Sequence, residues 1–135
     1  MKDSNHIDPQ TPTHVFLIED EYYAAVELKH ALSQLRPDYV LVGQAEDVEG
    51  AIDFLSGNHV DLIIADISLS DGYSFEALDQ LHLTNVPIIF TTAYAQYREC
   101  AASYSMVDFL LKPIDHVSLQ QALDKFEIKL NNTNV

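Results

Sequence analysis

The sequence predicts an α/β fold in which a parallel sheet is covered by helices on both faces. Five short apolar runs alternate with five stretches whose apolar residues recur at helical spacing. Such alternation requires right-handed crossovers, which place helices on the two faces of a parallel sheet. The central run, Val60 to Asp66, is apolar without a break from Leu62 to Ala65, as is typical of a strand buried on both faces.

The five predicted strands are short apolar runs bounded by polar residues or helix breakers. Arg36-Pro37-Asp38 separates the first helix from the second strand, and Gly57-Asn58 ends the second helix, because proline and glycine interrupt helices at such positions. The strands are predicted at His14 to Ile18, Tyr39 to Ala45, Val60 to Asp66, Val86 to Thr91 and Val107 to Leu111.

The five predicted helices show apolar residues three and four positions apart, as in the stripe from Leu119 to Leu130. Asp47, Ser74 and Asp115 stand at the starts of three of them and are typical capping residues. The fourth helix contains small residues and few large apolar ones. The helices are predicted at Tyr22 to Leu35, Asp47 to Leu55, Ser74 to Leu81, Ala95 to Ser105 and Asp115 to Leu130.

We expect the chain of 135 residues to divide into a disordered leader (residues 1–13), one domain (residues 14–130) and a frayed C-terminal tail (residues 131–135). The leader lacks the apolar segment of a secretory signal. No stretch approaches the ~20 apolar residues of a membrane span, so we expect no membrane contact. The single cysteine, Cys100, excludes an internal disulfide and fits a reducing compartment, and we expect a cytoplasmic protein.

The net charge limits the classes of molecule that the chain is expected to bind. The chain has 21 acidic and 7 basic residues, a net charge of −14. This balance disfavours direct nucleic-acid binding, which depends on lysine and arginine to replace phosphate counterions. It suits a metal cation or a basic partner surface, although most of these charges are interpreted as aids to solubility.

Polar side chains able to bind metal and phosphate follow four of the predicted strands, namely Glu19, Asp20, Asp66, Thr92 and Lys112. The carboxyl ends of parallel strands lie on one rim of the sheet, so these side chains should converge. Three carboxylates repel each other unless a cation intervenes, and oxygen ligands suit Mg²⁺. At such a site a carboxylate can attack phosphorus to form an acyl phosphate, while a lysine and a hydroxyl stabilise the phosphate oxygens.

Four motifs in this order resemble the receiver domain of two-component response regulators: Phe16 to Asp20, Asp61 to Asp66, Thr92-Ala93 and Lys112-Pro113. The resemblance covers roughly residues 14–130, nearly all of the predicted domain. It implies a flavodoxin-like (βα)5 doubly wound sandwich with the strand order 2-1-3-4-5.

Three longer segments resemble the LytTR-type (LytR/AlgR-like) receivers: Asp66 to Glu76, Phe90 to Tyr94 and Val107 to Ile114. Regulators of that subfamily usually continue into a LytTR DNA-binding domain that regulates transcription. This chain is too short to contain one, so we expect either a stand-alone receiver or a fragment of a longer regulator.

The resemblance implies a role for each residue of the rim. Asp66 is the expected phosphoacceptor. Glu19, Asp20 and Asp66 are the expected Mg²⁺ ligands, together with the backbone carbonyl of Ser68.

The resemblance also implies a switch. Lys112 is expected to pair with phosphate and Thr92 to supply the switch hydroxyl. Phe109 matches the aromatic residue of strand five that rotates inward when the hydroxyl moves. The peptide bond between Lys112 and Pro113 is expected to be cis.

The implied partner is a sensor histidine kinase. Phosphorylation is expected to change the surface of helix four, strand five and helix five, through which members of the family often form a homodimer. The resemblance implies a phosphorelay acceptor with slow self-dephosphorylation and not a turnover enzyme.

The sequence departs from the family pattern at two positions. Ser70 stands where many receivers have proline, so we expect a looser loop, and Phe109 lacks the hydroxyl of the more frequent tyrosine. Tyr94 stands where receivers tune the lifetime of the acyl phosphate. Tyr97 either lines the entrance to the site or is an exposed aromatic at a helix start. Asp71 is interpreted as a turn residue.

Two alternatives come from other functional classes. A hydrolase of the haloacid-dehalogenase type also uses an aspartate nucleophile, but it needs a second aspartate where this chain has Ser68. No cap domain fits in the length either. A degenerate receiver would act only as a protein-binding module, and the complete set of carboxylates, hydroxyl and lysine argues against it.

Overall fold

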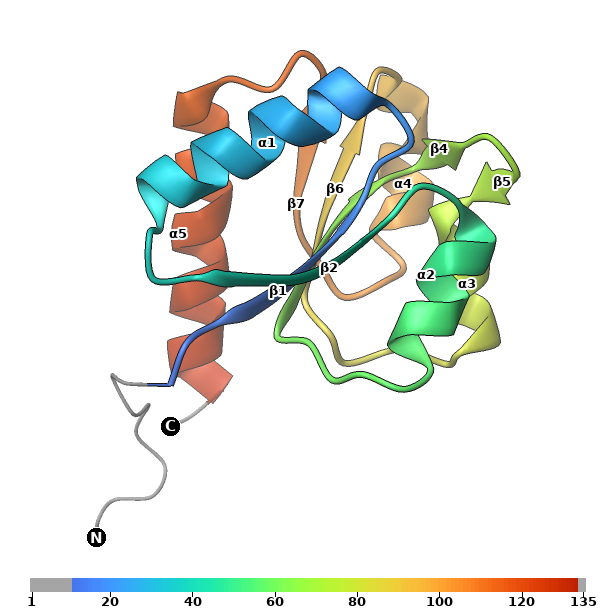
Figure 1. Cartoon of the computed structure of the whole chain (residues 1–135), viewed down its shortest axis with the longest axis horizontal. Helices are drawn as coiled ribbons and strands as arrows, with labels where there is room; N and C mark the ends of the chain where they lie inside the picture. The colour runs from blue at the N-terminus through green and yellow to red at the C-terminus, as the bar shows by residue number, and fades with distance from the viewer. Residues whose placement is uncertain (1–10, 134–135) are drawn as a thin grey trace, which may run out of the picture.

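The computed structural model describes residues 11–133, and its main sheet is entirely parallel (Figure 1). The order across the sheet is β2-β1-β3-β6-β7, which is the predicted order 2-1-3-4-5 once a separate small hairpin is set aside. The strands are β1 (His14–Ile18), β2 (Val40–Ala45), β3 (Leu62–Asp66), β6 (Ile88–Thr92) and β7 (Met106–Leu111).

Helices cover both faces of the sheet, as the alternation predicted (Figure 1). Helices α1 (Tyr22–Leu35) and α5 (His116–Thr133) pack on one face. The other face carries α2 (Val48–Leu55), α3 (Ser74–Gln80) and a short segment made of the 3-10 turn η1 (Ala95–Tyr97) and α4 (Arg98–Ala101). The predicted doubly wound fold is therefore confirmed.

Strand periodicity divides the core into two clusters. Along β1, Val15 and Leu17 join the cluster beneath α1 and α5, whereas Phe16 and Ile18 join the cluster beneath α2 and α3, because successive side chains point to opposite faces. All five residues of β3 are buried, as expected of the central strand of a sheet covered on both faces.

The predicted helix from Ala95 to Ser105 is much shorter in the structure, and this prediction is wrong in its extent. Only Ala101 of η1 and α4 is buried, so tertiary packing does little to stabilise a longer helix. The Ser103 hydroxyl also donates a hydrogen bond to the Cys100 carbonyl at 2.7 Å, which offers the backbone an alternative to helical bonding.

The chain ends differ from the predicted boundaries as well. Helix α5 continues to Thr133, so the first three residues of the predicted frayed tail are helical. Residues 134–135 and residues 1–10 of the predicted leader lie outside the described residues.

Two of the three predicted caps act as expected. The Asp47 and Asp115 carboxylates each accept a hydrogen bond from the amide three residues later, at 2.7 Å in both cases. Ser74 is instead the first residue of α3, and the Glu76 carboxylate accepts the Tyr73 amide hydrogen bond at 2.9 Å.

A cluster that the sequence did not reveal joins α1 to α5. The Arg36 guanidinium donates hydrogen bonds to Glu127 at 2.6 and 3.1 Å and to Asp124 at 2.7 Å. The Tyr39 hydroxyl also donates to Glu127.

Within residues 11–133, no helix has both the length and the apolar character needed to cross a bilayer.

Candidate functional site

Three carboxylates meet at the carboxyl rim of the sheet. Glu19 and Asp20 follow β1, and Asp66 is the last residue of β3. Because Ile18 is paired with Ala65 across these parallel strands, the residues that follow emerge side by side. One oxygen from each of the three carboxylates lies within 4.8 Å of the other two, so the predicted convergence is present.

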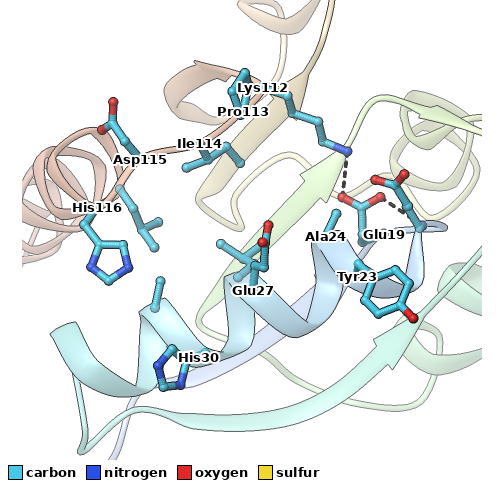
Figure 2. Close-up of a pocket in the computed structure, with 14 residues that line it drawn as sticks. Glu19, Tyr23, Ala24, Glu27, His30, Lys112, Pro113, Ile114, Asp115 and His116 are labelled. Carbon is cyan, nitrogen blue, oxygen red and sulfur yellow. Dashed lines mark hydrogen bonds and ion pairs between the residues drawn. The ribbon is translucent and has the colours of Figure 1, made fainter.

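Lys112 reaches this cluster from the end of β7. Its Nζ donates hydrogen bonds to Glu19 Oε1 at 2.8 Å and to Asp66 Oδ2 at 3.0 Å. Figure 2 shows the lysine extended toward the Glu19 carboxylate. The second Glu19 oxygen accepts the Glu21 amide hydrogen bond at 3.1 Å, and the Lys112–Pro113 peptide bond is cis.

Burial and crowding shift the pKa values of these groups. Burial raises the pKa of Asp66 to about 6, with repulsion from Glu19 and Asp20 adding to the effect and Lys112 opposing it. Burial and Glu19 also raise the pKa of Asp20. Burial works to lower the pKa of Lys112, but its hydrogen bonds to Glu19 and Asp66 prevail and raise it.

This donor set fits Mg²⁺. Three carboxylates face one ammonium, so the cluster retains excess negative charge. Glu19 and Asp66 are buried and Asp20 is exposed, which leaves one side of the cluster open to water. Oxygen ligands with room for water and phosphate oxygens are the surroundings that Mg²⁺ prefers.

Thr92 is the last residue of β6 and Phe109 lies within β7, and both are buried, with 1% and 4% of their surface exposed. The Thr92 hydroxyl accepts the Tyr94 amide hydrogen bond at 3.2 Å, and its carbonyl accepts the Lys112 amide at 2.8 Å. The Phe109 ring is already inside the core, with the Arg98 guanidinium carbon 4.6 Å from the ring centroid. The structure thus shows the inward position of the residue that was predicted to rotate inward.

Ser68 lies in a two-stranded hairpin that the sequence did not predict. Strands β4 (Ser68–Leu69) and β5 (Gly72–Tyr73) pair antiparallel directly after Asp66. Gly72 has φ +147°, a conformation that glycine adopts without strain. The hairpin carries Ser68 along the same rim, two residues beyond the proposed nucleophile.

Asp71 lies at the tip of this hairpin, as predicted for a turn residue, and it also makes hydrogen bonds to another element. Its carboxylate accepts amide hydrogen bonds from Val48 at 2.8 Å and from Glu49 at 3.3 Å. It therefore holds the hairpin against the N-terminus of α2, where backbone amides lack helical partners. The backbone amides of Val48 and Glu49 lower the pKa of Asp71.

A tyrosine cluster borders the same rim. The Tyr97 hydroxyl lies 3.4 Å from the Tyr73 hydroxyl, and the Tyr97 ring also contacts the Tyr94 ring at 6.2 Å between centroids. Tyr94 is exposed and Tyr97 partly exposed. Tyr97 therefore bridges the hairpin after Asp66 and the loop after Thr92, and its place at the entrance to the site stays a prediction.

A groove of about 600 Å³ opens beside the carboxylates, between α1 and the start of α5. Glu19 and Lys112 line one end of it, and the rest of its lining combines polar residues such as Glu27 and His30 with apolar residues of α1 and of the segment before α5 (Figure 2). The groove thus continues from the carboxylates along α1 with a mixed, largely apolar lining.

Comparison with known proteins agrees with this geometry. Residues 15–124 match the family described as the response regulator receiver domain. The sensory transduction protein LytT of Bacillus anthracis is 36% identical over 115 residues, which cover 84% of this chain and 46% of that protein. The transcriptional regulatory protein LytR of Staphylococcus aureus is 31% identical over 111 residues, covering 81% and 45%. The chain thus spans about half the length of these curated relatives.

Solved structures support the fold. The response regulatory domain of mrkE from Klebsiella pneumoniae superposes with a TM-score of 0.80 at 24% sequence identity, covering 89% of this chain and 99% of that one. A receiver domain described as CheY-like, from Methylobacillus flagellatus, gives a TM-score of 0.71 at 20% identity.

Proposed function

Because this chain belongs to the response regulator receiver domain family and is of the LytT/LytR type, we propose that Asp66 accepts a phosphoryl group from a sensor histidine kinase. The chain is a receiver domain of a two-component response regulator, and the transfer to Asp66 is the step that we add. The proposed site of action is the cytoplasm.

One observation carries this proposal. The Lys112 ammonium lies within 3.0 Å of oxygens from both Glu19 and Asp66, inside a cluster of three carboxylates. A nucleophilic carboxylate, a cation to neutralise an incoming phosphoryl group and an acidic metal-binding pair thereby occupy one place. Residues that merely capped turns would not require the Glu19 and Asp66 carboxylates to be buried beside an ammonium.

Glu19, Asp20 and Asp66 are the side chains that would hold Mg²⁺, with the Ser68 carbonyl as a further ligand. When bound, Mg²⁺ supplies positive charge to the oxygens of the transferring phosphoryl group. The excess negative charge of the cluster and the raised pKa of Asp66 support this assignment.

In the proposed transfer, an Asp66 carboxylate oxygen forms a bond to phosphorus while the bond from phosphorus to the kinase histidine nitrogen breaks. The histidine nitrogen keeps the electron pair of the broken bond. Lys112 moves its hydrogen bond from the carboxylate to a phosphoryl oxygen, and the Thr92 hydroxyl donates to another. Slow attack of water on phosphorus then breaks the bond to the Asp66 oxygen, releases inorganic phosphate and restores the carboxylate. The domain is thus proposed to be a switch that resets itself and not a turnover enzyme.

The output is proposed to be a change in the surface formed by α4, β7 and α5, driven by movement of Thr92 and by a shift of the equilibrium between inward and outward Phe109 further toward the inward position seen here. That surface exposes Leu111, Val117 and Ile128, with 46%, 66% and 60% of their surfaces accessible. Exposed apolar side chains favour self-association, and we propose a homodimer strengthened by phosphorylation. In a longer protein, this dimer would position a LytTR DNA-binding domain.

The test is incubation with Mg²⁺ and acetyl phosphate, followed by intact-mass measurement. The unmodified chain should gain the mass of one phosphate, and neither the Asp66→Asn variant nor a sample treated with a chelator should gain it. A chain that gains no mass is a protein-binding module without phosphorylation. Rapid release of inorganic phosphate over many turnovers would instead indicate a hydrolase.

A further inference from the structure

The side chain of Arg98 lies across the surface of Phe109. Arg98 is the first residue of α4 and is exposed, whereas Phe109 lies in the middle of β7 and is 4% exposed. The guanidinium carbon stands 4.6 Å from the centroid of the ring. A guanidinium at this distance over an aromatic face is attracted by the ring's electron density.

We propose that Arg98 is a positioning residue that holds Phe109 inward and thereby links α4 to β7. This inference rests on the proposed function only in treating Phe109 as a switch residue. The contact seen here is made with the ring inward, and the proposal is that an outward ring loses it. Arg98 therefore favours the inward ring before any phosphoryl group is present.

A second contact fixes the other side of the same segment. Tyr97, the residue before Arg98, reaches Tyr73 of the hairpin through ring and hydroxyl contacts. The η1–α4 segment is thus attached to the hairpin after Asp66 on one side and to β7 on the other. The segment itself buries only Ala101. Its position against the sheet therefore depends strongly on these side-chain contacts.

The strength of a cation–π contact determines how far the equilibrium of the Phe109 ring should shift. A cation–π contact at an exposed site shifts an equilibrium by about two- to fivefold. Removing the charge of Arg98 should raise the ratio of outward to inward Phe109 by that factor. The hydrophobic contacts of the ring remain, so the inward position should still be populated.

Fluorine NMR of the chain labelled with 4-fluorophenylalanine measures this ratio. The chain has six phenylalanines, and loss of one signal in the Phe109→Leu variant assigns the resonance. Without Mg²⁺ or phosphodonor, the Phe109 signal of Arg98→Gln should move toward the position it has in the urea-unfolded chain. Arg98→Lys, which keeps a cation, should move less.

Lys129→Met is the matched control. It also removes one positive charge from the surface, but Lys129 lies on α5, which packs against the opposite face of the sheet from Phe109. Its Phe109 signal should stay at the unmodified position. The other five fluorine signals verify that each variant is folded.

An Arg98→Gln signal that stays at the unmodified position would overturn the proposal. Equal displacement in Arg98→Lys and Arg98→Gln would also overturn it, because the charge would then have no role. Since the measurement uses the unphosphorylated chain, its result is independent of the mass assay on Asp66. A negative result here leaves the phosphoacceptor assignment intact, and a failed phosphorylation leaves this contact testable.

Discussion

Substitution of Asp66 by asparagine should make the metal-free protein more stable at neutral pH, although it removes the proposed nucleophile. Burial and the neighbouring carboxylates raise the pKa of Asp66 to about 6, from 3.8 for an ordinary aspartate. The folded state therefore binds the Asp66 proton more tightly than the unfolded chain does. Well below pH 3.8 Asp66 is protonated in both states and does not change the free energy of unfolding. As pH rises from about 3.8 toward 6, ionisation of Asp66 favours the unfolded chain.

The magnitude follows from the size of this shift. The pKa rises from 3.8 to about 6, and each unit corresponds to about 1.4 kcal/mol. Ionised Asp66 should therefore lower the free energy of unfolding by about 3 kcal/mol at pH 7. Asparagine has the same shape without the charge, and its carbonyl can still accept a hydrogen bond from Lys112.

Urea unfolding at several pH values, in the presence of a chelator, measures this effect. The stability difference between Asp66→Asn and the unmodified chain should widen by about 2.4 kcal/mol between pH 4 and pH 7, because the unfolded chain is already partly ionised at pH 4. This corresponds to about 1.2 M in urea midpoint for an m-value near 2 kcal/mol/M. Asp53→Asn, on the exposed face of α2, is the control and should show no such widening. A constant difference across this pH range would refute the electrostatic account of the cluster.

Three further outcomes follow from the structure. Saturating Mg²⁺ should raise the unfolding temperature, by the equivalent of about 2.7 kcal/mol at a hundredfold excess over Kd, and Asp20→Asn should lose most of this rise; equal rises in both proteins would contradict the ligand assignment. Asp71→Ala should lower the unfolding temperature, because its carboxylate accepts two amides at the start of α2, and an unchanged temperature in calorimetry would show that this attachment is not stabilising. A double-mutant cycle with Arg36→Met and Glu127→Gln should give a coupling of about 1 kcal/mol in urea unfolding, since the pair makes two hydrogen bonds; zero coupling would contradict it.

The sheet and the gathering of the site were predictable from the sequence because both depend on local signals. Each strand is an apolar run that ends in a polar residue, and parallel topology alone brings such ends to one rim. The grouping could therefore be predicted without knowledge of any tertiary contact for Glu19, Asp20, Asp66 and Lys112. Their hydrogen bonds and their pKa shifts required coordinates.

The errors came from tertiary effects. The length of α4 depends on how much of it is buried, and only Ala101 is buried, which periodicity could not reveal. The attachment of Asp71 to α2 joins residues 23 apart in sequence, so a local reading gave only a turn. The contact between the Arg98 guanidinium and the Phe109 ring likewise depends on the packing of α4 against β7.

The most direct test of the central claim is to locate the phosphoryl group. Borohydride reduces an aspartyl phosphate to homoserine, which peptide sequencing by mass spectrometry can place. After treatment with Mg²⁺ and acetyl phosphate, homoserine should appear at position 66 and at no other aspartate. Reduction at a different residue, or none at position 66 in a folded protein that binds Mg²⁺, would contradict the assignment of Asp66.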